Sequence, residues 1–389
     1  MYKIQTLNAI DSIGLKLFPT DLYQVADNVT DPDAILLRST SLHEKTLANT
    51  VKVIARAGAG VNNIPVDKMT KLGIPVLNTP GANSNAVKEL VIAGMLIACR
   101  NLCQAWNYVR QLNGDDAALN VAVERDKKQF AGFELPGKTL GVVGLGNVGV
   151  KVANTALALG MRVIGYDPTI TIKRAWELSS SVEEINNLDD LIKQADFISL
   201  HVPLVAETKH LINAGRLKIA KKGVILLNFA RDSIVDEIAL HAALDNGQVA
   251  SYVCDFPSAQ LKDHPRVICL PHLGASTREA EETCAIMAVK QLRDYLENGT
   301  IMYSVNFPSV EMPFNKGTRL TIANANVPSM VAQISTKLAA AQLNIMDLLN
   351  KSRDEIAYTL IDVDGAVNDT LIKEIAAIEG VIQIRRLVK

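Results

Sequence analysis

The stretch from Lys138 to Asp167 constrains the fold more than any other part of the chain. Residues 140–143 form a short apolar run suited to a buried parallel strand. A Gly-x-Gly-x-x-Gly turn follows at residues 144–149, and after it comes a segment with apolar side chains at helical spacing. A second strand is expected at residues 161–166, with Asp167 at its tip. This order predicts one unit of a doubly wound parallel sheet.

Each part of this unit suits the binding of a dinucleotide. Gly144 allows a tight turn, Gly146 lets the backbone approach a pyrophosphate, and Gly149 lets the helix pack on the strand. The helix N-terminus offers unpaired N–H groups and a partial positive charge to the phosphates. Asp167 can accept hydrogen bonds from both hydroxyls of the adenosine ribose, which favours NAD over NADP. The alternative is an ordinary glycine-rich turn between a strand and a helix.

The composition limits the class of protein. The chain has 389 residues, 48% of them hydrophobic, which is enough for two or three domains with buried cores. A formal net charge of −1 argues against general electrostatic binding of nucleic acid or of an anionic membrane. No apolar run is long enough to span a bilayer, and the N-terminus lacks the apolar stretch of a signal peptide.

The cysteines predict a reducing compartment. Their number, five, is odd and gives no disulfide framework. Cys99 and Cys103 lie one helical turn apart in an apolar stretch, so we expect buried small side chains, with a metal-binding pair as the alternative. Together with the composition, this predicts a soluble cytoplasmic protein with reduced thiols and no metal site.

Strands and helices alternate through most of the chain, which predicts an α/β fold. Residues 1–95 are expected to form one α/β domain and residues 96–277 the dinucleotide-binding domain. Residues 304–317 contain two prolines and no apolar periodicity, so they are expected to be a linker. Residues 318–389 show the order strand, helix, strand, strand, helix, strand of a ferredoxin-like unit.

One segment suggests a subunit contact. Residues 85–109 predict a single long apolar helix, and residues 113–135 are polar and are expected to be an irregular surface excursion. Long structureless segments in compact proteins usually have a role, and Trp106 and Tyr108 are candidates to anchor a partner subunit. A homodimer or homotetramer is therefore expected, with a mobile surface loop as the alternative.

Two side chains at strand ends are candidates for catalysis. His272 stands between a strand and a tight turn, and an imidazole with an ordinary pKa of about 6.5 can accept a proton at neutral pH. Arg231 ends another strand, where its planar guanidinium can bind a carboxylate. The remaining histidines are expected to be structural or surface residues, with a cofactor-edge role as the alternative for the first: His201, His43, His210, His241 and His264.

Three segments together resemble the D-isomer-specific 2-hydroxyacid dehydrogenase family: residues 141–149, residues 228–237 and residues 271–277. The resemblance spans nearly the whole chain. It implies an NAD-dependent enzyme with a Rossmann-type domain and a flavodoxin-like substrate-binding domain, which residues 278–303 would complete. The C-terminal unit resembles the ACT domain, a regulatory amino-acid sensor. This pairing favours the branch of the family that oxidises D-3-phosphoglycerate to 3-phosphohydroxypyruvate, the first step of L-serine biosynthesis.

The resemblance also implies residue roles. His272 would remove the substrate hydroxyl proton, and Arg231 would orient the carboxylate and polarise the carbonyl group. The cofactor would be bound by Gly144, Gly146, Asn147, Val148, Gly149, Asp167, Pro203, Thr208, Ala230 and Asp255. The substrate phosphate and carboxylate would lie near Arg56, Asn83 and Ser84. L-serine, as effector, would be held by Asn324, Asn326 and Asn344, with an unliganded dimerisation module as the alternative.

One position departs from the family pattern. Most members pair the histidine with a glutamate, and the matching position here is Gln260. A glutamine can hold a ring N–H but cannot stabilise an imidazolium ion by charge. A different carboxylate partner, a lower histidine pKa or weak activity would each be consistent with this change. Two other functions stay open: oxidation or reduction of another small 2-hydroxy acid, and a catalytically weak NAD-sensing interaction protein.

Overall fold

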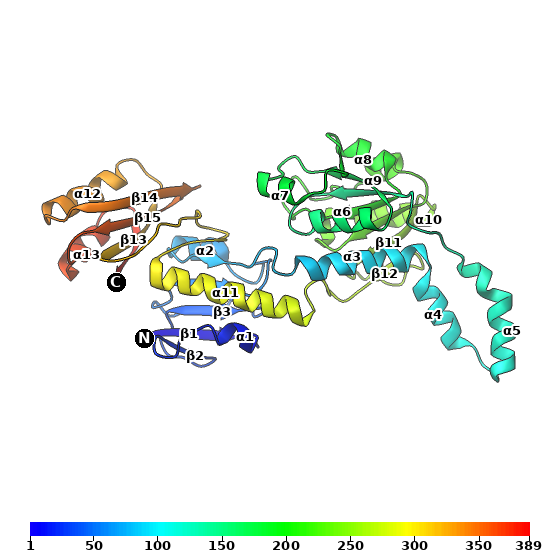
Figure 1. Ribbon diagram of the computed structural model, residues 1–389, viewed down its shortest axis with the longest axis horizontal. Coiled ribbons are helices and arrows are strands. Elements are labelled where there is room, and N and C mark those ends of the chain that lie inside the picture. The colour runs from blue at the N-terminus through cyan, green and yellow to red at the C-terminus, as the bar shows by residue number, and fades with distance from the viewer. The chain divides into compact units, whose positions relative to one another are not determined.

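The computed structural model describes residues 1–389, which divide into two compact units. The first unit contains residues 1–83 and 278–389, and the second contains residues 84–277 (Figure 1). The second unit thus begins before the predicted limit at residue 96. The reason is that helix α3 (Ser84–Cys99) packs on α6 (Gly149–Ala158) and on two strands of the same unit.

The second unit is built on a seven-stranded parallel sheet. The strand order is β12 (Val267–Cys269), β11 (Val249–Cys254), β10 (Val224–Asn228), β9 (Phe197–Leu200), β6 (Thr139–Val143), β7 (Arg162–Tyr166) and β8 (Glu183–Glu184). This order confirms the Rossmann-type fold. Every residue of β6, β9 and β10 is buried, which explains why these strands are continuous apolar runs in the sequence. The other helices of the sheet layers are α7 (Ile172–Glu177), α8 (Leu188–Gln194), α9 (Ala214–Ile219), α10 (Glu237–Asp245) and the short 3-10 turn η2 (Asp232–Ile234).

A helical arm projects from the second unit, where the sequence predicted one long helix and an irregular excursion (Figure 1). Both predictions are wrong. Asn101 takes a left-handed conformation with φ of 51° and separates α3 from α4 (Leu102–Gln111). The excursion contains α5 (Asp116–Asp126) and η1 (Lys127–Phe130), and Asp115 caps α5 by accepting a hydrogen bond from the backbone N–H of Ala118. Cys99 is buried as expected, whereas Cys103 is exposed on the arm.

The first unit contains a five-stranded parallel sheet with a flavodoxin-like order. This order is β2 (Tyr23–Ala26), β1 (Tyr2–Leu7), β3 (Ala34–Leu37), β4 (Val53–Arg56) and β5 (Val76–Leu77). Its helices are α1 (Ser12–Leu15), α2 (Val66–Lys71) and the long α11 (Arg278–Asn298). Helix α11 packs on α1, β3 and β4, so a segment late in the chain covers the N-terminal sheet.

The C-terminal part of the first unit confirms the predicted ferredoxin-like order. Its elements are β13 (Thr318–Ala325), α12 (Met330–Ala340), β14 (Ile345–Arg353), β15 (Ile356–Val363), α13 (Asp369–Ala376) and β16 (Val381–Val388). The sheet order is β14-β15-β13-β16, and every pair is antiparallel. One face is covered by α12 and α13, through a core that includes Leu338 and Leu371.

The segment predicted to be a linker is packed into the core. Phe307, Val310 and Met312 are buried, and Val310 pairs with Ile301 in an antiparallel bridge. They share one hydrophobic cluster with Tyr295 of α11 and with residues of β15, including Tyr358. The C-terminal sheet therefore shares a core with the N-terminal sheet.

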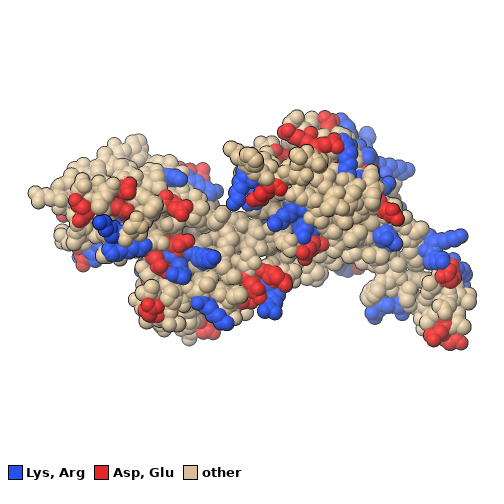
Figure 2. All heavy atoms as spheres, in the orientation of Figure 1, with Lys and Arg blue, Asp and Glu red and all other residues tan.

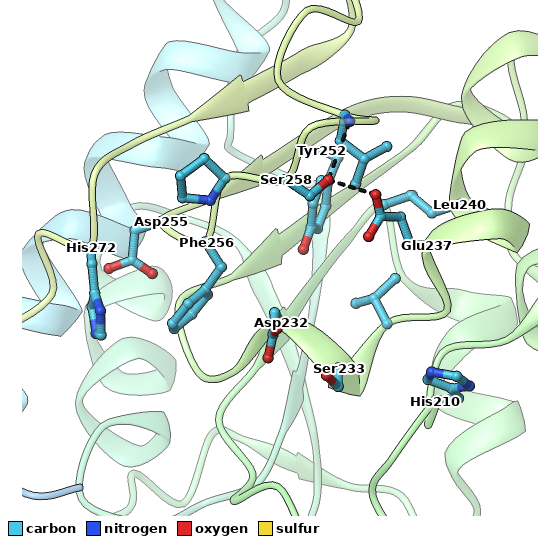
Figure 3. A pocket seen from close by; sticks show the side chains of 13 residues that line it. His210, Asp232, Ser233, Glu237, Leu240, Tyr252, Asp255, Phe256, Ser258 and His272 are labelled. Atoms are coloured by element: carbon cyan, nitrogen blue, oxygen red, sulfur yellow. Dashed lines mark hydrogen bonds between the residues drawn. The ribbon is translucent and has the colours of Figure 1, made fainter. Parts of the chain in front are cut away.

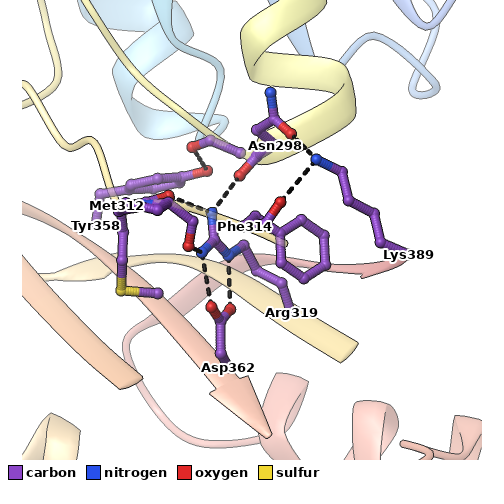
Figure 4. Close-up of polar contacts among 9 residues, drawn as sticks. Asn298, Met312, Phe314, Arg319, Tyr358, Asp362 and Lys389 are labelled. Atoms are coloured by element: carbon purple, nitrogen blue, oxygen red, sulfur yellow. Dashed lines mark hydrogen bonds and ion pairs between the residues drawn. The ribbon is translucent and has the colours of Figure 1, made fainter. Parts of the chain in front are cut away.

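Arg319 of β13 joins these parts through every donor of its guanidinium group (Figure 4). Its Nε and Nη2 donate to the two carboxylate oxygens of Asp362, at 2.6 and 2.7 Å. Nη1 donates to the carbonyls of Asn298 and Met312, and Nη2 also donates to that of Pro313. The centre of the Phe314 ring lies 4.4 Å from the guanidinium carbon. Because Arg319 is fully buried, this complete set of partners offsets the cost of removing its charge from water.

None of the helices is long and apolar enough to cross a membrane. No group of three or more histidine, cysteine, aspartate and glutamate side chains is arranged to hold a metal ion. On the face shown in Figure 2, acidic and basic side chains are interspersed.

We predict that Arg319→Met lowers the free energy of unfolding by about 3–5 kcal/mol, because it leaves the Asp362 carboxylate buried without its charge partner. The measurement is the urea midpoint of the unfolding transition, followed by circular dichroism. The matched control is Glu374→Gln, which removes an exposed ion pair with Lys337 and should cost at most about 1 kcal/mol. Equal effects of the two substitutions would contradict this role of Arg319.

Candidate active site

The glycine turn connects β6 to α6 at the carboxyl edge of the second unit's sheet. Gly144 has φ of 92°, and its N–H donates to the carbonyl of Tyr166 at 2.8 Å. A Cβ atom on Gly149 would lie 1.9 Å from the Gly144 carbonyl oxygen, so only glycine fits there. A Cβ atom on Gly146 would meet nothing within 4 Å. The open space at Gly146 and the adjoining start of α6 suit a pyrophosphate that approaches the backbone.

Asp167 follows β7 directly and lies beside this turn. Its Oδ2 accepts a hydrogen bond from the Leu145 N–H at 2.8 Å, and its Oδ1 accepts one from the Thr169 N–H at 2.8 Å. The Thr169 hydroxyl also donates to Oδ1, at 3.1 Å. These bonds orient the carboxylate, and Oδ2 keeps further acceptor capacity for a ribose hydroxyl. A half-buried carboxylate at this strand end would repel a 2′-phosphate group, so it fits NAD rather than NADP.

The loop that follows β9 is held by short polar contacts. The Thr208 hydroxyl donates to the carbonyl of Pro203 at 2.5 Å, so the structure brings these two predicted residues together. His201 is half-buried and bonds to the Ser199 hydroxyl, and desolvation lowers the pKa of its imidazole to about 3. The ring is therefore neutral at pH 7, and it fits the structural interpretation.

Asn228, to which no role was assigned from the sequence, positions the Arg231 loop. It is fully buried at the end of β10. Its Nδ2 donates to the carbonyl of Arg231 at 2.8 Å and its Oδ1 accepts from the Ala230 N–H at 3.2 Å. An asparagine that ends an otherwise apolar buried strand was the available signal. The Arg231 guanidinium is exposed and donates to the Ala230 carbonyl at 2.6 Å.

His272 and Asp255 lie together after β12 and β11 (Figure 3). The backbone N–H of His272 donates to the Asp255 carbonyl at 3.0 Å, and His272 has a left-handed φ of 46°. Asp255 is 1% exposed; its Oδ2 accepts from the Gly274 N–H at 3.0 Å, while its Oδ1 is buried without a protein partner. Burial raises the pKa of the Asp255 carboxyl group, and the Gly274 N–H and the charges of His272 and Arg231 oppose that rise.

A pocket of about 340 Å³ opens in front of these two residues (Figure 3). Its polar lining includes Asp232, Glu237 and Ser258, the last two joined by a hydrogen bond of 2.6 Å. The Phe256 ring packs against the His272 imidazole at 5.0 Å between centroids. Gln260 is exposed and does not line this pocket. Of the carboxylates that line the pocket, that of Asp255 lies beside the His272 ring (Figure 3).

In the first unit, Arg56 ends β4 at the carboxyl edge of its sheet. Its Nε donates to the Arg38 carbonyl at 2.8 Å, and its Nη1 bonds to the carbonyl of Gly60. Arg38 follows β3 on the same edge and forms an ion pair of 2.8 Å with Glu281. Arg38 was not singled out from the sequence, although an arginine directly after a strand is the signal that pointed to Arg56. Asn83 is the last residue of this unit's N-terminal segment.

Comparison with known proteins shows the family. Residues 92–274 match the profile described as D-isomer specific 2-hydroxyacid dehydrogenase, NAD binding domain. A D-3-phosphoglycerate dehydrogenase of Haemophilus influenzae is 32% identical over 383 residues, covering 94% of this chain and 88% of that relative. The chain belongs to the D-isomer specific 2-hydroxyacid dehydrogenase family.

Two further relatives show how far the similarity extends. The D-3-phosphoglycerate dehydrogenase of Methanocaldococcus jannaschii is 39% identical over 296 residues, covering 74% of this chain, and the chain spans 54% of that relative's length. The structure of NAD+-bound 3-phosphoglycerate dehydrogenase in Entamoeba histolytica has a TM-score of 0.60 and 27% identity, covering 78% of this chain and 98% of that one. The family's NAD-binding domain thus lies within the second unit, where the glycine turn and Asp167 fit a dinucleotide.

The ferredoxin-like part of this family member holds the three predicted effector residues, but it does not bring all of them together. Asn324 and Asn326 lie at one end of β13, where their side chains bond to the carbonyls of Ala325 and Asp354. Asn344 precedes β14 at the opposite end of the sheet, since Ile345 pairs with Val363 and Thr318 pairs with the same residue. The length of β13 separates the two ends by roughly 20 Å. One copy therefore does not form a site from all three.

We predict that Gly146→Ala weakens NADH binding without lowering the melting temperature. The added methyl group meets no protein atom but occupies the space where a pyrophosphate would approach the backbone. Gly149→Ala is the matched variant and should lower the melting temperature, because its Cβ would collide with the Gly144 carbonyl. Calorimetric NADH titration and thermal denaturation of both proteins make the measurement. Normal NADH affinity in Gly146→Ala would remove this turn from the cofactor site.

Proposed function

We propose that this family member is an NAD-dependent enzyme that oxidises D-3-phosphoglycerate to 3-phosphohydroxypyruvate, the step that begins L-serine biosynthesis. The observation that carries the proposal is that the side chains of His272 and the buried Asp255 lie side by side, on the sheet edge that also carries the glycine turn (Figure 3). The named activity of its relatives gives the substrate class. No specific feature of the site favours another 2-hydroxy acid or a purely NAD-sensing protein. Cytoplasmic location stays a prediction from the sequence.

The residues at the site would divide the reaction between them. NAD, when bound, supplies the acceptor for the hydride from C2 of the substrate. The His272 imidazole removes the proton of the C2 hydroxyl group, and Arg231 binds the carboxylate through its planar fork. Arg56 and Arg38 supply positive charge for the substrate phosphate, and Asn83 and Ser84 are assigned to substrate binding as well.

Asp255 would replace the glutamate that most of the family uses. When His272 takes the proton, its ring becomes an imidazolium ion, and a nearby negative charge stabilises that form. The buried position of Asp255 keeps water from screening this interaction. The unpartnered Oδ1 would then gain a charged neighbour during the reaction, or an amide donor from the cofactor.

We predict that His272→Ala lowers turnover by at least about 10²-fold, the usual contribution of a general base, while NADH still binds. The measurement is kcat with D-3-phosphoglycerate and NAD, together with a calorimetric NADH titration. Unchanged turnover would remove His272 from the mechanism.

Asp255→Asn should also lower turnover, because the imidazolium ion that forms during the reaction loses a nearby negative charge. The measurement is kcat under the same conditions. Gln260→Ala is the control and should leave kcat unchanged; a loss of turnover in Gln260→Ala alone would transfer the role to Gln260.

We further propose that the C-terminal part is an ACT-type regulatory unit that binds L-serine between two copies of the chain. Two copies are needed because Asn324 and Asn326 lie at the opposite end of the sheet from Asn344. The asparagine amides can bond to both the carboxylate and the ammonium group of an amino acid. Serine would inhibit only if it binds the inhibited state more tightly than the active one.

L-serine is expected to lower the reaction rate of the full chain and to have less effect on Asn326→Ala. Asn113→Ala, on the exposed arm, is the control and should respond like the unmodified chain. Removal of the C-terminal part is a poor control, because it would uncover Phe307 and Ile301 in the shared core. Equal rates at zero and millimolar serine would reject the effector.

We propose that the chain forms at least a homodimer through the arm. Neither α4 nor α5 has a buried residue, and Leu102, Trp106 and Val109 expose apolar side chains on one face of α4. Trp106 is 63% exposed and suits an anchor at the centre of an interface. Tyr108 has a different role, since its hydroxyl bonds to Asp126 at 2.5 Å and holds the arm's two helices together.

Trp106→Ala should shift the proposed homodimer toward the monomer in solution, because it removes the largest exposed apolar side chain of the arm. The chain has one other tryptophan, Trp176, which is 86% exposed on α7 and provides the matched control. Sedimentation analysis of both variants at micromolar concentration makes the comparison. A monomeric mass of the unmodified chain, or equal dissociation in both variants, would rule out this interface.

A further inference from the structure

Two cysteines face each other beside the active site. Cys254 ends β11 and Cys269 ends β12, and they are direct partners across this parallel pair of strands. Their sulfur atoms lie 3.5 Å apart. Asp255 follows the first cysteine, and His272 lies three residues after the second.

We propose that Cys254 and Cys269 form a redox-modification site, in which a peroxide converts the thiol pair to a disulfide that displaces the His272 turn. No step of the proposed oxidation of phosphoglycerate uses either thiol, so the site goes beyond that function. The disulfide does not depend on the proposed function, but its effect on turnover does.

The strand geometry permits the bond. Neighbouring strands lie about 4.8 Å apart, within the range of about 4.4–6.8 Å between the two Cα atoms that disulfides span. The sulfur atoms must close from 3.5 Å to a bond of about 2.0 Å. Strand β12 can make this shift because it has three residues and lies at the edge of the sheet, with β11 as its one strand neighbour.

The two thiols differ in access, which sets the order of the chemistry. Cys269 is partly exposed, whereas Cys254 is fully buried, and burial raises the pKa of the Cys254 thiol to about 12. The Cys269 thiolate attacks one peroxide oxygen, the O–O bond breaks, and hydroxide leaves, so the sulfur becomes a sulfenic acid. The Cys254 sulfur then attacks the Cys269 sulfur, the S–O bond breaks, and the oxygen leaves as water with the Cys254 proton. The close approach of the sulfurs favours this second step over reaction with solvent.

Two backbone hydrogen bonds connect the movement of β12 to the active site. The Leu270 N–H donates to the Cys254 carbonyl at 2.8 Å, and the His272 N–H donates to the Asp255 carbonyl at 3.0 Å. Drawing Cys269 toward Cys254 changes the position of β12 relative to both acceptors. His272 and Asp255 then lose the mutual placement that the proposed reaction needs, so the oxidised form is expected to be less active.

The experiment treats the full chain with hydrogen peroxide, blocks the remaining thiols by alkylation and maps the linked peptides by mass spectrometry. We expect one linked pair, Cys254 with Cys269, and an at least tenfold loss of turnover that dithiothreitol restores. Cys269→Ser and Cys269→Ala should form no link and keep their turnover after peroxide. Cys103→Ser is the matched control, because Cys103 is exposed on the arm but has no partner cysteine beside it, and it should lose turnover like the unmodified chain.

The outcomes separate the alternatives. Absence of the linked pair, or a link that involves Cys103, would overturn the redox site whatever the activity. A linked pair with unchanged turnover would overturn the displacement of the His272 turn. If the untreated chain does not oxidise D-3-phosphoglycerate, the proposed function fails, while the linked peptide still decides whether the thiol pair forms a disulfide.

Discussion

The parallel pairing of β6 with β7 on one side and β9 on the other is the constraint on which the active site depends. The connections after β6 and after β9 run in opposite directions from this point, so the two loops diverge and leave room for a ligand. All strands of the sheet are parallel, so Asp167, Arg231, Asp255 and His272 follow strands that end on one edge. The order and direction of the strands thus bring these four residues to one edge of the sheet, whatever contacts their side chains make.

Burial then decides what each polar group on that edge can do. Asn228 is fully buried and uses its amide to hold the Arg231 loop, while desolvation of the His201 imidazole keeps that ring neutral. Asp255 is buried as well, but its Oδ1 lacks a protein partner. A buried, incompletely bonded carboxylate is costly, and such groups concentrate at functional sites. The same strand ends bring Cys254 and Cys269 together, so the chemistry of the thiols and that of the site share one short piece of backbone.

The position of the C-terminal part depends on two buried arginines. Arg319 uses all of its donors on Asp362 and on carbonyls from α11 and the 304–317 segment, and Arg385 donates to the last-turn carbonyls of Tyr295 and Leu296. The Tyr295 carbonyl also accepts from the Gly299 N–H at 3.0 Å, and the helix dipole favours a cation at this end of α11. The ferredoxin-like sheet is therefore held to the end of α11, the helix that begins six residues after His272.

The sequence alone determined the Rossmann-type and ferredoxin-like folds, because apolar periodicity and glycine positions are local and follow from backbone sterics. It also singled out Arg231 and His272, since strand-end residues of a parallel sheet meet at one edge. Only the tertiary structure decided the rest. The packed 304–317 segment, the helical arm, the exposure of Gln260 and the separation of Asn344 from Asn326 depend on contacts between residues far apart in the chain. The pairing of Cys254 with Cys269 belongs with them, because strand neighbours are set by the order of the sheet and not by local spacing.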